Sequence, residues 1–169
     1  MDLNKKQFTL RVADKDLVVE VSNLASQTNG SVMVTYGGTT IFATVVMDKK
    51  DKDIHFFPLT VDFEEKFYSV GKILGGQFIR REGRPSEDAA LSSRIVDRVI
   101  RPLFDHRMRR SIQVVLTVLS YDGENSTDFV SLIAASTALS ISDIPWGGPV
   151  AGLRVSKKMG EFSINPLNK

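Results

Sequence analysis

One stretch of the sequence brings arginines, an aromatic side chain and glycines together over ten residues. It reads Gly75-Gly76-Gln77-Phe78-Ile79-Arg80-Arg81-Glu82-Gly83-Arg84. A guanidinium group presents a planar fork of donors to phosphate oxygens, whereas an aromatic or aliphatic side chain presents an apolar surface to a base. This mixture favours binding of a polyanion such as single-stranded nucleic acid. The candidate contacts are Phe78, Ile79, Arg80, Arg81 and Arg84.

A second set of arginines follows on a predicted helix that opens at Ser86, directly after Pro85. Arg94, Arg98 and Arg101 are spaced by four and three residues, so they share one face of that helix. Asp97 is at helical spacing from Arg94 and from Arg101 and can pair with either. The stripe therefore either binds an anion such as phosphate or forms ion pairs within the protein, and the residues leave both readings open.

The distribution of charge along the chain indicates a binding site for a polyanion in the same region. Residues 66–110 contain eleven basic residues, nine of them arginine, against five acidic residues, although the whole chain has a net charge of only +2. Such a local excess in a nearly neutral chain points to a polyanion site. The alternative is a solvated surface held by internal ion pairs.

Several other chemistries find no support in the residue types. The chain has no cysteine and two histidines, which excludes a disulfide scaffold and a thiolate metal site. Gly71-Lys72 is not a phosphate loop, because that motif ends in its lysine and opens a helix. The acidic residues Asp122, Glu124 and Asp128 are interpreted as helix capping and loop solvation. No catalytic residue and no metal ligand is assigned.

The elements that would hold these residues follow from hydrophobic periodicity. Strands are expected at residues 8–12, 17–21, 31–36, 39–47, 56–63, 112–120, 150–156 and 161–164. Helices are expected at residues 86–102 and 125–140. Residues 64–85 read as a long functional loop. The strand at 112–120 is a near-continuous apolar run, which predicts burial on both faces. This order indicates an α+β fold with two main helices on a mixed sheet.

Length and composition agree with one domain. The chain has 169 residues, 42% of them hydrophobic and 25% charged, which is ordinary for a globular protein. No stretch approaches the roughly 20 apolar residues that span a bilayer, and the first six residues do not begin a signal peptide. Absence of cysteine agrees with a cytoplasmic location. The last five residues, Asn165 to Lys169, read as a turn, so we expect a C-terminally incomplete domain.

Several motifs in order along the chain carry a family resemblance. The most specific are Gly83-Arg84-Pro85-Ser86-Glu87 and Ile100-Arg101-Pro102-Leu103-Phe104, supported by Phe56-Phe57-Pro58-Leu59-Thr60-Val61 and Ser93-Arg94-Ile95-Val96-Asp97-Arg98. Together with Gln113-Val114-Val115 and Ile144-Pro145, they resemble the first RNase PH-type domain of the bacterial polynucleotide phosphorylases. The resemblance covers residues 8–166, and it implies an RNase PH-like fold for residues 1–169 with an RNA-contacting loop at 64–85. It also implies that Arg94, Arg98 and Arg101 face the RNA path.

The resemblance also implies a function. The family degrades RNA from its 3′ end with inorganic phosphate, releases nucleoside diphosphates, and can run in reverse as a polymerase. Its members form homotrimeric rings, carry a second RNase PH-type domain and KH and OB-fold modules, and can join RNA-degradation complexes. The phosphate site and the carboxylates that hold Mg²⁺ or Mn²⁺ belong mainly to the second domain. This chain would then be the RNA-guiding half, inactive by itself.

The sequence departs from the family pattern at one of its candidate contacts. Ile79 stands where family members often have a second aromatic residue, so that position offers an apolar bump to a base instead of a stacking ring. Two rival readings stay open: a non-catalytic RNA-binding or ring-scaffold domain, and a stand-alone tRNA-trimming enzyme of the RNase PH type. The Gly-Arg-Pro-Ser-Glu motif argues against the second. A weaker third reading is a protein-binding domain whose arginines pair with a partner's acids.

Overall fold

The computed structural model describes residues 4–73 and 85–167. The strands are β1 (Lys6–Val12), β2 (Lys15–Val21), β3 (Gly30–Tyr36), β4 (Thr39–Met47), β5 (Leu59–Glu65), β6 (Ile112–Ser120), β7 (Val155–Lys158) and β8 (Glu161–Ile164). The helices are α1 (Glu87–Ile100) and α2 (Thr127–Ser140), with short 3₁₀ helices at Asn23–Ala25, Phe67–Val70 and Arg101–Leu103. Most strand and helix positions agree with the pattern in the sequence.

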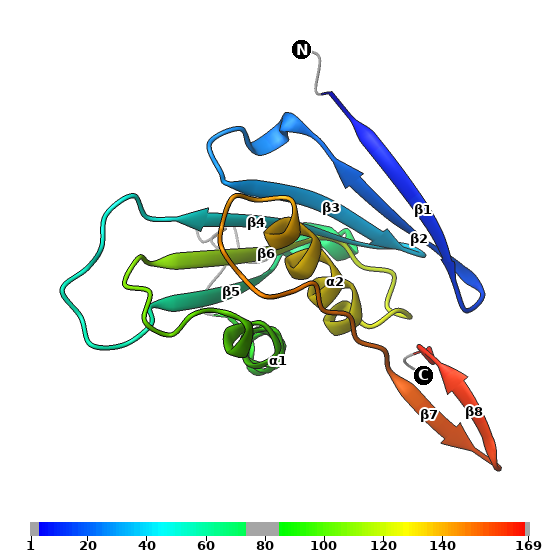
Figure 1. The fold of residues 1–169 in the computed structure, drawn as a ribbon. Coiled ribbons are helices and arrows are strands. Elements are labelled where there is room, and N and C mark those ends of the chain that lie inside the picture. The colour runs from blue at the N-terminus through cyan, green and yellow to red at the C-terminus, as the bar shows by residue number, and fades with distance from the viewer. Residues whose placement is uncertain (1–3, 74–84, 168–169) are drawn as a thin grey trace.

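Six strands form one mixed sheet in the order β1-β2-β3-β4-β6-β5 (Figure 1). All neighbouring strands are antiparallel except β5 and β6, which run parallel. The β3–β4 hairpin turns at Gly37, whose φ of +62° is a conformation that glycine adopts without a steric penalty. The α1 segment lies between β5 and β6 in the chain, as a parallel pair requires. The expected α+β fold with a mixed sheet is confirmed.

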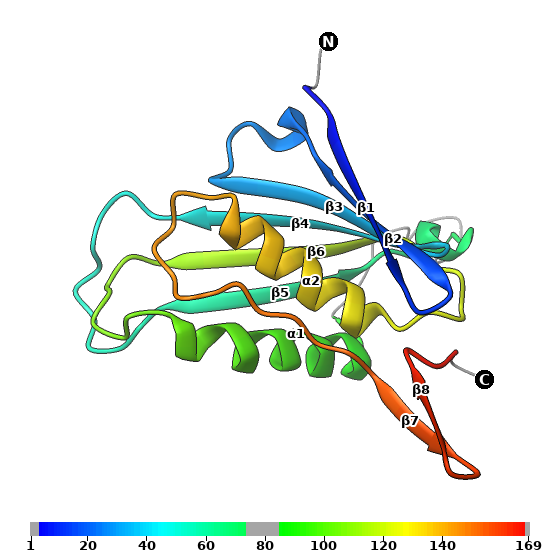
Figure 2. The same cartoon turned by 45° about the vertical axis from the view of Figure 1, so that its right-hand side comes forward.

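Both helices cover the same face of the sheet (Figure 2). Helix α2 packs on β3 and β4, and α1 packs on β5 beside α2. The core between these layers is apolar and fully buried at positions such as Val34, Ile41, Leu116, Val96 and Ala135. Small side chains on α2 allow this close approach to the sheet, as the run of alanine and serine in the sequence predicted.

The prediction that residues 112–120 are buried on both faces is wrong. Ile112, Val114 and Leu116 face the helices and are buried, whereas Gln113 on the opposite face is exposed and Val115 is half-buried. The described helices lie on one face of the sheet only, so the apolar residues on the other face have no second layer above them.

The C-terminal hairpin β7–β8 stands apart from the main sheet as a separate two-stranded sheet (Figure 1). Its first strand begins at Val155, five residues later than the sequence pattern predicted, because the chain from 141 to 154 first runs back across α2 as coil. Among the described helices, none combines the length and apolar character needed to cross a membrane.

Candidate nucleic-acid interface

Helix α1 begins with a complete N-terminal cap. The Ser86 hydroxyl accepts a hydrogen bond from the backbone N–H of Ala89 at 3.0 Å and donates one to Glu65 Oε2 at 2.6 Å. Glu87 and Asp88 occupy the first turn, where the helix dipole favours negative charge. The cap therefore fixes the helix start to the end of β5, immediately after the segment that carries the first set of arginines.

The face that α1 buries differs from the one that four-residue spacing predicted. Ala89, Ser92, Val96 and Ile100 are buried against the sheet and α2. The four-residue spacing of Leu91, Ile95, Val99 and Leu103 predicts one apolar face, yet Leu91 and Ile95 are 59% and 45% exposed. Periodicity identified an apolar side of the helix, but small residues at 89 and 92 let the helix rotate that side away from the sheet.

The outer face of α1 therefore carries apolar and basic side chains together. Leu91 and Ile95 are four residues apart, as are Arg94 and Arg98, and all four side chains are exposed. Within the described residues, no hydrogen bond or ion pair engages Arg94 or Arg98. Both guanidinium groups are available to an anion from solution.

Arg101 has a different environment, although it shares the stripe in sequence. Its Nε donates to Asp97 Oδ2 at 2.9 Å, and its Nη2 donates to Asp97 Oδ1 at 2.6 Å. The same Nη2 donates to the carbonyl of Leu59 at 3.1 Å, and Nη1 donates to that of Phe57 at 3.5 Å. Helical spacing allowed Asp97 to pair with Arg94 or with Arg101. In the structure it pairs with Arg101.

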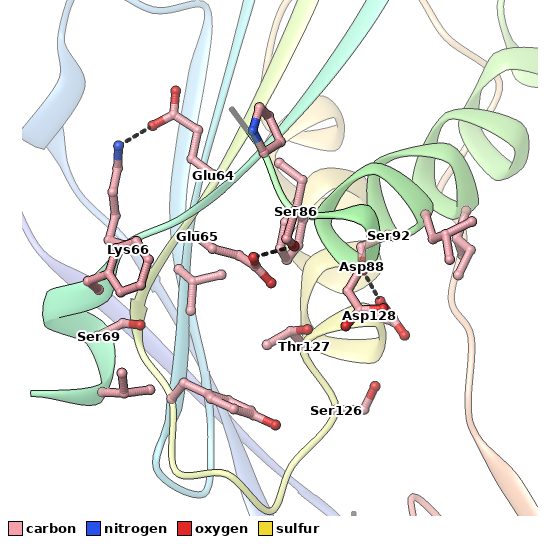
Figure 3. A pocket seen from close by; sticks show the side chains of 18 of the residues that line it. Glu64, Glu65, Lys66, Ser69, Ser86, Asp88, Ser92, Ser126, Thr127 and Asp128 are labelled. Atoms are coloured by element: carbon pink, nitrogen blue, oxygen red, sulfur yellow. Dashed lines mark hydrogen bonds and ion pairs between the residues drawn. The ribbon is translucent and has the colours of Figure 1, made fainter. Parts of the chain in front are cut away.

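A groove lies at the N-terminal ends of both helices, beside the outer face of α1 (Figure 3). It has a volume of about 1130 Å³ and is lined by the end of β5, the 3₁₀ helix Phe67–Val70, the first two turns of α1 and the start of α2. Leu91 and Ile95 belong both to the outer face of α1 and to the wall of the groove. The groove and the arginine pair are thus adjacent surfaces of one helix.

The charges of the groove do not favour a phosphate chain inside it. Four carboxylates line it, from Glu64, Glu65, Asp88 and Asp128, against two basic side chains. Lys66 pairs with Glu64 at 2.9 Å, and Asp128 accepts a hydrogen bond from Ser92 at 2.5 Å. Like charges repel, so an RNA backbone is better accommodated along Arg94 and Arg98 than within the groove.

The structure gives no support for a metal site in this chain. Across residues 4–73 and 85–167, no group of three or more histidine, aspartate or glutamate side chains is placed to hold an ion. His106 stacks on Phe57 at 6.0 Å, and His55 lies in an exposed turn between β4 and β5. A divalent cation therefore finds no ligand set among the described residues.

Two aspartates have pKa values below their ordinary range. Burial by itself would raise the pKa of Asp122, but hydrogen bonds from the backbone of Asn125, Glu124 and Gly38 and from the Asn125 side chain outweigh it and hold the pKa well below normal. At Asp105, hydrogen bonds from the side chain and backbone of Arg107 lower the pKa to about 2. Asp122 joins the β3–β4 turn to the loop before α2, which agrees with the structural interpretation of this acidic group.

The first set of predicted contacts cannot be placed. Phe78, Ile79, Arg80, Arg81 and Arg84 lie outside the described residues. Of the expected loop at 64–85, the described part includes the last two residues of β5 and the 3₁₀ helix Phe67–Val70. Of the predicted contacts, the structure describes Arg94, Arg98 and Arg101.

Sequence reasoning missed the contacts that separate Arg101 from its neighbours. The acceptors at Phe57 and Leu59 are backbone carbonyls more than forty residues away in the chain. Carbonyl groups carry no sequence signal, and only the packing of α1 on β5 brings them to the guanidinium. The one available sign was Asp97 at helical spacing, which was identified as a partner for Arg94 or Arg101.

Known proteins resemble this chain over nearly its whole length. The family described as 3′ exoribonuclease family, domain 1 (RNase PH) matches residues 14–145. Polyribonucleotide nucleotidyltransferases of Exiguobacterium sibiricum and Bacillus mycoides are 51% and 50% identical over 166 residues, which is 98% of this chain. The chain spans only 22% and 23% of their length.

A solved structure supports the fold independently. Rrp46 from rice (Oryza sativa) superposes with a TM-score of 0.66 over 99% of this chain and 70% of its own. Its sequence identity is 11%, so the likeness concerns the fold alone. The two-layer arrangement of sheet and helices is therefore shared by a protein of very different sequence.

Proposed function

Because the chain belongs to the 3′ exoribonuclease family, as its domain 1, we propose that it is the RNA-guiding part of a phosphate-dependent 3′-to-5′ exoribonuclease. The close relatives are polyribonucleotide nucleotidyltransferases, so the reaction of the whole protein is the transfer of the 3′-terminal nucleotide to inorganic phosphate, which releases a nucleoside diphosphate. The reverse reaction would polymerise nucleoside diphosphates.

One observation carries this proposal for the chain itself. Arg94 and Arg98 are exposed on one face of α1, and no described residue neutralises them. Exposed, unpaired guanidinium groups along one helix suit the repeating phosphates of an RNA backbone. Arg80, Arg81 and Arg84 precede this helix in sequence and would extend the basic path, with Phe78 and Ile79 contacting bases.

The chemistry itself would take place elsewhere. Phosphorolysis requires charge neutralisation at the scissile phosphate and a positioned phosphate nucleophile. A divalent cation, Mg²⁺ or Mn²⁺, would supply neutralisation, but its ligands would come from a second RNase PH-type domain, since the described residues do not form a ligand set. The role of this chain is to hold the RNA backbone so that the 3′ end reaches that centre.

The proposed setting follows from the relatives. Their length exceeds that of this chain more than fourfold, which leaves room for a second RNase PH-type domain and for KH and OB-fold modules. We propose a cytoplasmic homotrimer that binds single-stranded RNA and can join an RNA-degradation complex. A non-catalytic RNA-binding or ring-scaffold domain and a stand-alone tRNA-trimming enzyme of the RNase PH type are the competing functions.

The direct test is binding of a fluorescent single-stranded RNA to the full chain at low salt. We expect the double variant Arg94→Gln/Arg98→Gln to bind roughly tenfold more weakly, because it removes two backbone contacts. Arg107→Gln/Arg110→Gln removes the same charge from side chains that are already paired with Asp105 and Asp51, and it serves as the matched control.

The control variant Arg107→Gln/Arg110→Gln distinguishes a specific RNA site on α1 from general electrostatic attraction. Binding that weakens equally in both double variants would mean that bulk charge alone attracts RNA. Binding that is unchanged by Arg94→Gln/Arg98→Gln would remove α1 from the RNA path. Duplex DNA of equal length, added as competitor, measures the preference for single-stranded RNA.

A second prediction concerns catalysis. We expect no release of nucleoside diphosphate when the 169-residue chain is incubated with RNA, inorganic phosphate and Mg²⁺, because the described residues form no cluster of three or more ligands for the cation. Thin-layer separation of products from 3′-labelled RNA measures this. Phosphate-dependent release by the chain alone would locate the catalytic centre here and overturn the division of roles.

A further inference from the structure

The guanidinium of Arg101 is almost fully used inside the protein. An arginine side chain has five N–H donors. Four of them are directed at acceptors: two at the Asp97 carboxylate, one at the carbonyl of Leu59 and one at the carbonyl of Phe57. The side chain is 35% exposed, and its partner Asp97 is 24% exposed. A phosphate could engage Arg101 fully only after these hydrogen bonds are broken.

These hydrogen bonds join two elements that matter for the interface. Phe57 and Leu59 form the entry to β5, and the carbonyl of Pro58 between them accepts a hydrogen bond from Ile112, the first residue of β6. Phe57 is buried against Phe104, which follows the end of α1, with ring centroids 5.2 Å apart. Arg101 therefore fastens the C-terminal end of α1 to the edge of the sheet where β5 begins.

We call the hydrogen bonds of Arg101 to Asp97, Phe57 and Leu59 the clamp. Its position determines where the exposed arginines lie. Arg98 precedes Arg101 by less than one helical turn and Arg94 by about two turns. The N-terminal end of α1 is fixed by Ser86 to Glu65, and the C-terminal end is fixed by Arg101 to Phe57 and Leu59. With both ends held on the same strand, α1 can neither slide nor rotate on the sheet, and its outer face keeps one orientation.

We propose that Arg101 is a positioning residue that acts through Arg94 and Arg98, and that it is not itself a phosphate ligand. This inference rests on the proposed function, because it assigns a role within the same RNA-binding face. The arginines of one stripe thus divide into two that contact RNA and one that fixes the helix bearing them. Breaking the clamp would leave the Asp97 carboxylate without its arginine donors, which is costly at a half-buried site.

The decisive variant is Asp97→Asn, because the two roles of Arg101 predict opposite signs. If Arg101 were a phosphate ligand, removal of a carboxylate that competes for it would strengthen RNA binding. If Arg101 is a positioning residue, the amide no longer holds the guanidinium, the helix end loosens, and RNA binding weakens. We expect a fall of about tenfold in affinity, since small displacements of positioned groups have effects of this size or larger.

Two further variants complete the experiment. Asp105→Asn makes the same charge change at an exposed ion pair with Arg107 that takes no part in the hydrogen bonds of Arg101, and we expect it to leave RNA affinity equal or slightly higher. Arg101→Lys keeps the positive charge but cannot form the planar fork, so we expect it to bind as weakly as Asp97→Asn. All variants are studied in the full chain, at a temperature where circular dichroism reports the wild-type helix content.

The outcomes separate three roles. Weaker binding by folded Asp97→Asn and Arg101→Lys, with Asp105→Asn unaffected, supports positioning. Equal or tighter binding by Asp97→Asn, with Arg101→Lys close to wild type, would make Arg101 a phosphate ligand and overturn the inference. A lower melting temperature with unchanged RNA affinity in both variants would make the clamp merely structural and would also overturn it.

Failure of this inference is distinguishable from failure of the proposed function. The double variant Arg94→Gln/Arg98→Gln leaves the clamp intact and tests the contacts themselves. If that variant binds RNA as wild type does, the proposed function fails whatever Asp97→Asn does. If Asp97→Asn does not fold, Arg101→Lys and the melting temperature of wild type with and without RNA still decide between the roles.

Discussion

Arg94, Arg98 and Arg101 are at helical spacing in the sequence, yet their guanidinium groups have different surroundings. Two of them meet no described partner, and the third meets a carboxylate and two carbonyls. The sequence left open whether this stripe binds an anion or forms internal ion pairs. The structure shows the internal ion pair at Arg101, and the anion-binding reading of Arg94 and Arg98 stays a prediction.

At the scale of single residues, the lowered pKa of Asp122 predicts that the free energy of unfolding depends on pH. Its carboxylate accepts hydrogen bonds from Gly38, Glu124 and Asn125, and its pKa is lowered in the folded state. Because the pKa is lower in the folded state, the ionised carboxylate stabilises the protein fully at pH values above its unfolded-state pKa of about 3.9. This contribution is lost as the pH falls through the folded-state pKa. We expect wild type to lose stability below about pH 4 more steeply than Asp122→Asn.

Urea unfolding measured between pH 3 and pH 7 checks this. At pH 7, Asp122→Asn should lower the free energy of unfolding by about 1–2 kcal/mol, a value limited by the partial exposure of the carboxylate. Asp53→Asn, at an exposed carboxylate between β4 and β5 that has no described hydrogen bond, is the control and should change little. Parallel pH profiles for wild type and Asp122→Asn would contradict the assignment.

At the scale of elements, α1 is the part of the fold on which the interface depends, and its N-terminal cap is testable. Ser86→Ala removes the acceptor for the Ala89 N–H and the bond to Glu65, so we expect a loss of about 1 kcal/mol in stability. Ser93→Ala, on the same helix but bonded only to the carbonyl of Ala90, should be neutral or slightly stabilising. Thermal unfolding of both variants provides the comparison, and equal melting temperatures would show that the cap contributes nothing.

The helices and strands also show which parts of the fold can be predicted from the sequence. The hairpins β1–β2 and β3–β4 were predictable because alternation and the Gly37-Gly38 turn are local signals. The exposure of Leu91 and Ile95 was not predictable, because spacing identifies an apolar side of a helix but not the neighbour that covers it. For the same reason the opposite face of β6 was expected to be buried, although no described helix covers it.

At the scale of the whole molecule, the fold class could be predicted from the sequence, and the motifs identify the family. The contacts that each arginine of α1 makes could not be predicted. Motifs such as Ile100-Arg101-Pro102-Leu103-Phe104 identify the family, but they do not reveal that one arginine is held by carbonyls from a distant strand. Tertiary contacts with the backbone leave no pattern in the sequence. The structure was needed to divide the basic residues by role.

The central claim is that the outer face of α1 binds an RNA backbone through Arg94 and Arg98. The most direct measurement is the dependence of single-stranded RNA affinity on salt concentration for the wild-type full chain and for Arg94→Gln/Arg98→Gln. For single strands, each phosphate contact contributes about 0.7 to the slope of log K against log salt. We predict a slope shallower by about 1.4 in the double variant, because two contacts are lost. An identical slope in the two proteins would contradict the claim.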